Sequence, residues 1–458
     1  MTWGSLLALI TVGLTGAGAT AATAAPGDSV RSGSGAARQV ASIALSPQAV
    51  SLPASGSAHT INVSLALADS AGSPITSGSL ATPVTLHVYG PSGGVLRATT
   101  PTLRTAARSV SFSYSGAAVA NTIIVNAVSG HAFAQMAFHP PQPNTSTGGP
   151  AVTFPMSNAS RNIAKGFTFR VSVGRGPSHR VEMDTGSHGI VVPASALGPG
   201  AVGPGPAAQI TYTSDGKIFR GNYYLAPITL QAGGVSATTV PIRVLAVKSS
   251  ACAPGFPQCV ADRIAGLGML GVGFDRGAAS QTPPELANAF LALQSITTGS
   301  MHPGYIIARN GVTLGLNLAN TAGFDSVALT AGGSGPGDWN TEPGCFAFPQ
   351  IGGYSQQCGT VLMDTGIPSA IFGLPSAQRP PSIATSIPDG TAVAISVGQP
   401  ASPVLSYSFA AGDGGAMTPT SLRWAAGTAP FINTGRRVIS SDDYLYDAGA
   451  GAVGFRAH

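Results

Sequence analysis

Two segments of the sequence place the same three residues between apolar stretches. Asp184-Thr185-Gly186 follows one apolar stretch and precedes another, and Asp364-Thr365-Gly366 has the same surroundings. A turn of this kind projects its carboxylate from the edge of a sheet. The glycine lets backbone N–H groups approach the carboxylate, and the threonine hydroxyl can tie the turn to the opposite one. The sequence therefore predicts two carboxylates in equivalent positions.

The chemistry of this pair depends on whether the two turns face each other. If they do, the carboxylates of Asp184 and Asp364 cannot both be ionised at moderate pH, and they share a proton. One carboxyl group then acts as a base and the other as an acid, and a water molecule between them becomes a nucleophile toward a peptide carbonyl. The alternative is that both aspartates only cap hairpin turns.

The composition indicates that short strands position these turns. Only 9% of the 458 residues are charged, three of the 17 acidic residues are Glu, and Gly 61 and Pro 36 make up about a fifth of the chain. Glu favours helices and Asp favours turns, whereas Val, Thr and Ser are common in strands and turns. The net charge of +5 comes from few acids, without a run of Lys or Arg. These features exclude a coiled coil, a helical bundle and a nucleic-acid-binding protein.

The N-terminus is expected to be an export signal over residues 1–24. Leu6–Leu14 form an apolar core too short to span a bilayer, and Ala22-Thr23-Ala24 offers a small-residue cleavage site. No Lys or Arg precedes the core, so the signal is atypical or the true start lies upstream. A low-complexity segment follows at 25–37. We therefore expect a secreted or cell-surface location.

Residues 38–139 are predicted to form a β-sandwich, because apolar residues alternate with polar ones in several short runs separated by turn signals. The stretch Val63–Ile75, with Asp69, Gly72 and Pro74, is similar to bacterial immunoglobulin-like domains, so this class of sandwich is expected. A linker rich in Pro, Gly and Thr follows at 140–158. The strands are expected at Ser42–Leu45, Thr60–Leu67, Val84–Val88, Val110–Tyr114 and Thr122–Val128.

The four cysteines fall into two local pairs, Cys252/Cys259 and Cys345/Cys358. In an exported chain this spacing suggests two small disulfide loops. Four buried free thiols are the alternative. Zinc is disfavoured because no His lies at ligand spacing beside either pair, and we expect no metal and no organic cofactor.

Further segments accompany the two Asp-Thr-Gly turns. Phe167–Gly174 leads into the first turn, Ala208–Gly221 has the pattern of a hairpin with Tyr212 before its turn, and Met269-Leu270-Gly271 is an apolar strand ending in Gly. Cys358 lies shortly before the second turn. In these features the chain from about 160 to 458 resembles the pepsin-like, two-lobed aspartic proteases.

The resemblance implies an all-β fold in which the immunoglobulin-like sandwich precedes a two-lobed pepsin-like acid protease fold. Its lobes would comprise residues 159–335 and 336–458, with the active-site cleft between them, and a monomer is expected. It implies a bacterial aspartic endopeptidase that cleaves extended polypeptides and has neither a nucleic-acid partner nor an integral membrane span. The implied site residues are the catalytic Asp184 and Asp364, the supporting Thr185, Gly186, Ser187, Thr365 and Gly366, and the flap residues Tyr212, Thr213 and Ser214.

The sequence departs from the family pattern at three places. Val191 stands where a Trp is usual, and Ile367 stands where a Thr or Ser usually donates a hydrogen bond to the second aspartate. Without that donor the charged form of the second carboxylate is disfavoured, so Asp184, beside Ser187, is expected to be the ionised member. The second apolar-apolar-Gly strand is either Ala425-Ala426-Gly427 or Asn433-Thr434-Gly435, and the spacing to Asp447 favours the latter.

Two other functions remain open at this point. The Ile367 departure is compatible with a catalytically weakened protease-like binding or adhesion module. A carboxylate pair acting on a glycosidic bond is weaker, because sugar sites need aromatic platforms and the chain has three Trp. Of the other residues near the motifs, His188 is expected to be a solvated loop residue, and the one helix expected lies at Pro283–Leu293.

Overall fold

The computed structural model describes most of the chain from residue 149 onward and the strands of the N-terminal part. The segment 25–37, most of the expected export signal, residues 140–148 of the linker and Thr213 lie outside the described residues. The residues described are 11–13, 42–47, 49–52, 59–69, 75, 80, 82–90, 95–98, 108–115, 122–139, 149–212, 214–276, 286–332, 338–352, 354, 356–427 and 429–458.

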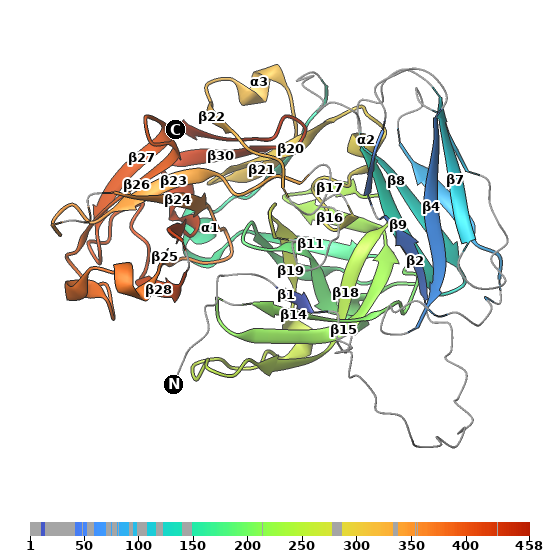
Figure 1. The fold of residues 1–458 in the computed structure, drawn as a ribbon, viewed down its shortest axis with the longest axis horizontal. Helices are drawn as coiled ribbons and strands as arrows, with labels where there is room; N and C mark the ends of the chain where they lie inside the picture. The colour runs from blue at the N-terminus through green and yellow to red at the C-terminus, as the bar shows by residue number, and fades with distance from the viewer. Residues whose placement is uncertain are drawn as a thin grey trace, which may run out of the picture.

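The N-terminal part consists of two four-stranded sheets that enclose a core of their own (Figure 1). Phe112 and Phe138 meet edge to face across this core. The five strands expected from the sequence are present, and the immunoglobulin-like class stays a prediction. One sheet has the order β2 (Ser42–Ser46), β4 (His59–Ala68), β7 (Arg108–Ser115), β6 (Val95–Ala98); the other has the order β3 (Ala49–Ser51), β9 (Ala132–His139), β8 (Ile123–Ser129), β5 (Thr85–Tyr89).

The outer face of β8 and β9 is packed against the rest of the chain. The side chains of Asn126 and Gln135 both donate hydrogen bonds to the carbonyl of Pro241, at 3.2 and 3.1 Å. The ring of Phe133 lies so close to Gly205 that a Cβ there would come within 2.7 Å of the ring. Every residue of β9 is buried, so this strand lacks the alternation that marks a half-exposed strand.

A ten-stranded sheet carries the first Asp-Thr-Gly turn. Its strand β1 lies within the expected export signal and pairs antiparallel with β14. The strand order is β1 (Thr11–Gly13), β14 (Ala207–Tyr212), β15 (Lys217–Ala226), β18 (Ile242–Cys252), β13 (His188–Pro193), β19 (Met269–Val272), β12 (His179–Asp184), β11 (Thr168–Val173), β16 (Ile228–Ala232), β17 (Val235–Thr238).

A seven-stranded sheet carries the second turn, and a six-stranded sheet lies beside it along the upper edge of Figure 1. The seven-stranded sheet has the order β27 (Ser402–Ala410), β26 (Ala392–Gln399), β23 (Pro343–Ala347), β24 (Gln357–Leu362), β29 (Phe431–Asn433), β25 (Ala370–Leu374), β28 (Leu422–Ala426). The six-stranded sheet has the order β10 (Val152–Pro155), β21 (Gly311–Leu316), β20 (His302–Ala308), β30 (Asp442–Asp447), β31 (Ala452–Ala457), β22 (Asp325–Ala328).

The strands around the two turns repeat one arrangement. Next to the first Asp-Thr-Gly turn, β19 lies between β12 and β13. It runs parallel to β12 and antiparallel to β13. Next to the second Asp-Thr-Gly turn, β29 lies between β24 and β25. It runs parallel to β24 and antiparallel to β25. The segment Asn433-Thr434-Gly435 therefore continues the strand equivalent to Met269-Leu270-Gly271, whereas Ala425 and Ala426 belong to β28, on the far side of β25.

Helices are short throughout the described residues. The helix expected at Pro283–Leu293 is wrong: residues 286–293 form turns, and Pro283 itself lies outside the described residues. Asn288 holds this buried segment, because its amide donates to the carbonyl of Val272 at 2.7 Å and accepts from the backbone N–H of Phe290. The α-helices are α1 (Ala159–Lys165), α2 (Gln294–Thr297) and α3 (Leu318–Thr321); the 3₁₀ turns are Ala194–Ala196, Ile264–Gly266, Ser376–Gln378, Pro381–Ile383 and Arg436–Ser440.

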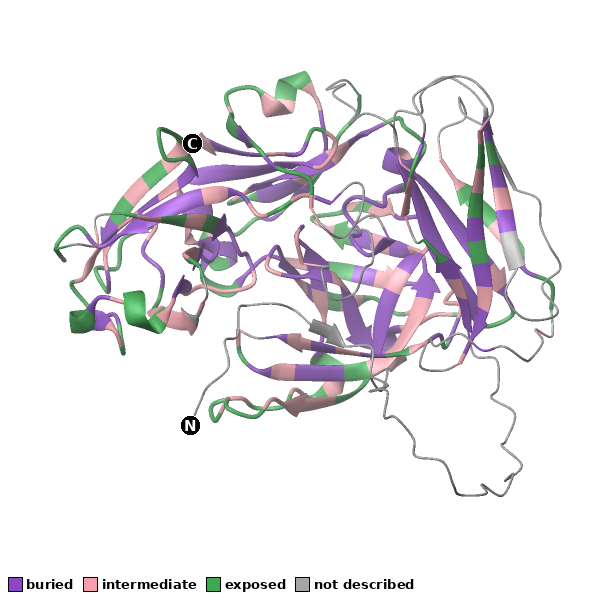
Figure 2. Ribbon diagram, viewed as in Figure 1, coloured by how far each residue is buried: buried purple, intermediate pink, exposed green. Residues whose placement is uncertain are grey.

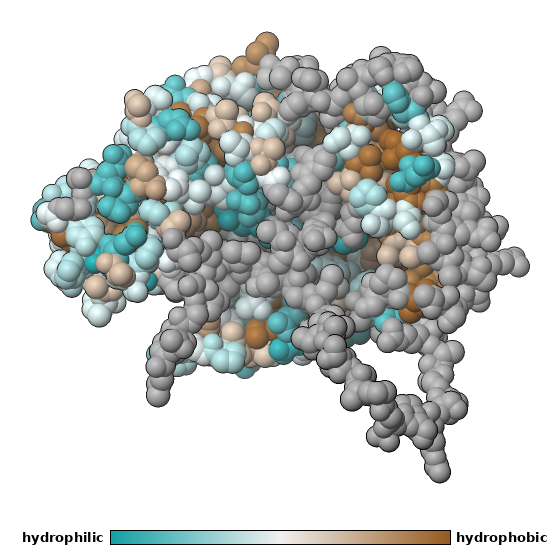
Figure 3. All heavy atoms as spheres, in the orientation of Figure 1, coloured by the Kyte–Doolittle hydropathy of each residue, from teal (hydrophilic) through white to brown (hydrophobic). Residues whose placement is uncertain are grey.

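Burial follows the sheets. Figure 2 shows buried residues concentrated along the central strands and exposed ones at the turns and outer edges. In Figure 3, hydrophobic residues gather over the sandwich at the right, whereas the face over β26 and β27 at the left is mostly hydrophilic. Among the described residues, none of the helices has the length and hydropathy needed to cross a membrane.

The packing of the sandwich can be tested through Gly205 and Phe133. Gly205→Ala is expected to lower the free energy of unfolding by about 1–3 kcal/mol, because the added methyl group overlaps the ring. Phe133→Leu removes the overlap, so the two changes should couple by about 0.5–3 kcal/mol in a double-mutant cycle of urea unfolding. Gly352→Ala is the matched control, because a Cβ there meets nothing within 4 Å. Purely additive effects of Gly205→Ala and Phe133→Leu would contradict the packing of the sandwich against the rest of the chain.

Candidate active site

The two Asp-Thr-Gly turns lock into each other through their threonines. The backbone N–H of Thr185 donates to Oγ1 of Thr365 at 3.0 Å, and the backbone N–H of Thr365 donates to Oγ1 of Thr185 at 2.9 Å. Each hydroxyl in turn donates to the carbonyl before the opposite aspartate: Thr185 to Met363 and Thr365 to Met183. These four buried hydrogen bonds fix the two turns face to face.

This arrangement brings the carboxyl groups of Asp184 and Asp364 into hydrogen-bonding contact, and both side chains are buried. The N–H of Gly186 donates to Asp184 Oδ1 at 2.7 Å, and that of Gly366 donates to Asp364 Oδ1 at 2.8 Å. A Cβ on Gly186 would lie 2.4 Å from Asp364 Oδ2. Only glycine therefore fits between the two carboxylates at this position.

The Oδ2 atom of each carboxyl group accepts a side-chain hydrogen bond, and the donor residue differs between the two. The hydroxyl of Ser187 donates to Asp184 Oδ2 at 2.5 Å. In the second half Ile367 occupies the equivalent place, and the side-chain amide of Asn433 donates instead, to Asp364 Oδ2 at 2.6 Å. The other end of this amide accepts from the N–H of Gly435, which fixes its orientation. The donor expected to be missing is thus supplied from β29.

Sequence reasoning placed Asn433 at the right strand but gave it no role. Its equivalent in the first half is Met269, which cannot donate. A comparison of the two turn regions could have identified it. Ile367 lacks the hydrogen-bond donor that Ser187 provides at the first turn, and Asn433 has a donor where Met269 has none.

Asp184 is favoured as the protonated member of the pair, contrary to the expectation that it is the ionised member. Burial, and next the negative charge of Asp364, hold the pKa of Asp184 well above its usual range. The hydrogen bond from Asn433 needs an acceptor oxygen on Asp364, and an ionised carboxylate and the carbonyl oxygen of a protonated carboxyl group both supply one.

The pair opens into a cleft of about 680 Å³ lined by both halves of the chain. Tyr212, at the end of β14, is buried there, packs edge to face on Phe219 and hydrogen-bonds to the Ser187 hydroxyl. Burial raises the pKa of Tyr212 well above its usual value. Ser214 lies at the hairpin turn, and its carbonyl accepts from the guanidinium of Arg423, from the opposite half, at 2.7 Å. The hairpin β14–β15 therefore closes one side of the cleft.

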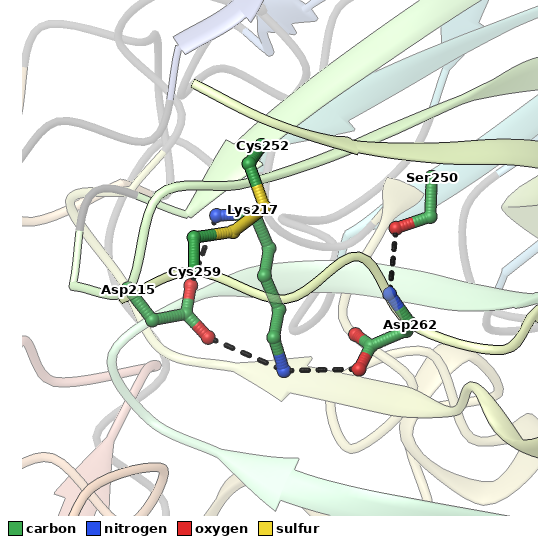
Figure 4. The surroundings of a disulfide bond; sticks show 6 residues. All are labelled: Asp215, Lys217, Ser250, Cys252, Cys259 and Asp262. Atoms are coloured by element: carbon green, nitrogen blue, oxygen red, sulfur yellow. Dashed lines mark hydrogen bonds and ion pairs between the residues drawn. A yellow bond between two sulfur atoms is a disulfide. The ribbon is translucent and has the colours of Figure 1, made fainter. Parts of the chain in front are cut away.

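A disulfide loop supports the turn of this hairpin (Figure 4). Lys217 lies between two carboxylates, 3.4 Å from Asp215 and 3.1 Å from Asp262. The loop closed by the Cys252–Cys259 disulfide donates the N–H of Ala253 to the carbonyl of Gly216 at 2.8 Å. The second disulfide joins Cys345 of β23 to Cys358 of β24, the strand that leads to Asp364.

Two buried side chains behind the turns also carry titratable groups. His188 is buried, which corrects the expectation of a solvated residue, and burial lowers its pKa to about 4. The carboxyl group of Glu342 is buried and accepts the N–H of Met363, directly before Asp364; burial raises its pKa to about 7. Arg436 donates to the carbonyl of Thr365 at 2.7 Å and lies 3.6 Å from Glu182.

Within the described ranges, no group of three or more His, Cys, Asp and Glu side chains could hold a metal ion. The groups that the site itself presents are the two carboxyl groups and the hydrogen-bond donors around them.

Comparison with known proteins adds one finding. No protein-family model and no curated protein matches the chain. Among solved structures, the crystal structure of the aspartic proteinase from Irpex lacteus is similar, with a TM-score of 0.41 and 12% identity over 67% of this chain and 97% of that chain. A similarity at this level assigns neither a family nor an activity, so the function is inferred below from the geometry.

Asn433→Ala tests the replacement of the missing donor. Removing the amide leaves the buried Oδ2 atom of Asp364 without its side-chain donor, so the free energy of unfolding is expected to fall by about 1–3 kcal/mol in urea unfolding. Adding Ile367→Thr to this variant should restore a donor and regain part of that free energy. An Asn433→Ala variant as stable as the wild type would contradict the assignment.

Glu342→Gln tests the buried acid behind the second turn. The folded-state pKa of about 7 exceeds the ordinary 4.5. The stability contributed by the neutral carboxyl is therefore fully present below pH 4.5 and lost as the pH rises through 7, by about 3 kcal/mol. The wild type should lose that much more stability than Glu342→Gln between pH 4.5 and 7 in urea unfolding. Asp325→Asn, at an exposed acid of β22, should leave the wild-type pH dependence unchanged; parallel curves for wild type and Glu342→Gln would contradict the assignment.

Proposed function

We propose that the chain is a secreted aspartic endopeptidase of the pepsin-like, two-lobed type. The observation that carries the proposal is the pair of interlocked Asp-Thr-Gly turns, which holds two buried carboxyl groups in contact at the floor of an open cleft. In a buried pair that shares one proton, the protonated carboxyl group can act as an acid while the ionised one acts as a base.

The mechanism follows from the donors around each carboxylate. Asp364, which accepts hydrogen bonds from Asn433 and Gly366, takes a proton from a water molecule as the water oxygen attacks the peptide carbonyl carbon. Asp184 gives its proton to the carbonyl oxygen, and a neutral gem-diol forms. The proton on Asp364 then passes to the peptide nitrogen, a diol proton returns to Asp184, and the C–N bond breaks to release acid and amine.

The hairpin β14–β15 is proposed to act as a flap over the substrate. Tyr212 and Ser214 line the cleft from the hairpin, and the link from Ser214 to Arg423 joins it to the opposite half. An extended polypeptide is the substrate that suits such a cleft, because it can present its main-chain hydrogen-bonding groups to a hairpin along its whole length. Thr213, which is expected to take part, lies outside the described residues.

The cellular setting is inferred from independent features. Two disulfides suit an oxidising compartment outside the cytoplasm, in agreement with the expected export signal. We propose a bacterial, secreted or cell-surface monomer in which an immunoglobulin-like sandwich supports the protease part.

The second candidate is a protease-like binding module without turnover. It draws support only from Ile367, and the donation from Asn433 to Asp364 removes most of that support.

Asp184→Asn and Asp364→Asn test the proposal. Each is expected to reduce cleavage of a denatured protein between pH 3 and 7 by at least about a thousandfold, because one carboxyl can no longer act as both acid and base. Asp389→Asn, at an exposed acid outside the cleft, is the matched control. Wild-type protein that binds a statine-type transition-state mimic but cleaves nothing at any pH would favour the binding module and contradict the protease.

A further inference from the structure

A second cavity, of about 580 Å³, lies outside the cleft and is lined by three arginines. Arg161 comes from α1, Arg170 from β11 and Arg180 from β12. All three are exposed, whereas their strand neighbours Phe169 and Val181 are buried, so the cavity lies on the outer face of the sheet. Among the described residues no Asp or Glu lines it.

The three arginines have no direct ion-pair partner among the described residues, although the charge of Glu182 is near enough to Arg180 to interact with it. Arg170 and Arg180 are direct cross-strand partners in the pairing of β11 with β12. Like charges directly opposite each other are destabilising in a sheet. Within the described part of the chain, no carboxylate lies within ion-pair distance of Arg161, Arg170 or Arg180, whereas Arg456, for example, lies 2.8 Å from Asp443. An anion bound between the two strands would offset the repulsion.

This arginine pocket adjoins the cleft. Glu182 lines the cleft and lies two residues from Arg180 on the same face of β12. On the other side, Gly166 lines the arginine pocket, and a Cβ there would come within 2.3 Å of Glu182 Oε1. Along β12, Asp184 and Arg180 are four residues apart, which is about 13 Å in a strand. A polypeptide in the cleft therefore reaches the pocket within a few residues.

We propose that the arginine pocket binds acidic side chains of the polypeptide substrate and so selects substrates with an acidic segment outside the cleaved bond. Guanidinium groups bind carboxylates bidentately, and two of them side by side suit neighbouring Glu or Asp residues. Gln231, the other cross-strand partner of Arg170, adds an amide to the same lining. Glu182 repels an acidic side chain placed beside it in the cleft, so the preference is confined to residues that reach the pocket.

The inference depends on the proposed function for its meaning but is tested by binding alone. The probe is a pair of labelled peptides that differ only in a short flanking run of Glu or of Gln, titrated into the full chain carrying Asp184→Asn. The Glu peptide is expected to bind about tenfold more tightly than the Gln peptide at low salt. Adding Arg170→Gln and Arg180→Gln should abolish this preference. Arg175→Gln, in the exposed turn between the same two strands and outside the pocket, should leave it intact.

The outcomes separate this inference from the proposed activity. Equal binding of the Glu and Gln peptides, or an equal loss with Arg175→Gln, would overturn the arginine pocket even if the wild type cleaves the Gln peptide. Arginine-dependent binding of inorganic phosphate without a preference for the Glu peptide would overturn it as well. An arginine-dependent preference in the inactive variant would support it, even if the wild type cleaves neither peptide and the proposed activity fails.

Discussion

The structure depends on the reciprocal hydrogen bonds between Thr185 and Thr365. Two carboxyl groups buried in contact repel each other once ionised, so something must hold them together against that repulsion. The four threonine hydrogen bonds do so because each threonine satisfies one group before and one group within the opposite turn. The strands β12, β19 and β13 place the first turn in the same geometry in which β24, β29 and β25 place the second. Arg436 also donates a hydrogen bond to the carbonyl of Thr365.

The symmetry of the two turns ends at the Oδ2 atoms of the two carboxyl groups, which accept from different residue types. A serine hydroxyl can donate or accept, whereas an asparagine N–H only donates. The raised pKa of Asp184 favours it as the acid of the proposed mechanism, and Asp364, which accepts from Asn433, is then the proposed base. The exchange of donor between Ile367 and Asn433 preserves the number of donors at the pair while changing which oxygens can carry the proton.

The sequence could predict those features that depend on local pattern. The Asp-Thr-Gly turns, the hairpin with Tyr212, the local cysteine pairs and most sandwich strands each leave a signature within a few residues. Features that arise from packing between distant segments left none. Asn433 meets Asp364 only because β29 inserts between β24 and β25. His188 and Glu342 are buried by strands that the local sequence does not reveal, and the apolar spacing at 286–293 reflects burial of an irregular segment that Asn288 holds.

We propose that the pair shares one proton and that this proton resides on Asp184. Carbon-13 NMR of aspartate-labelled protein measures this directly, with the two carboxyl signals assigned through Asp184→Asn and Asp364→Asn. We expect the Asp184 carboxyl to stay protonated at pH values where exposed aspartates are ionised. Titration of the Asp184 carboxyl in the ordinary range of exposed aspartates would contradict this.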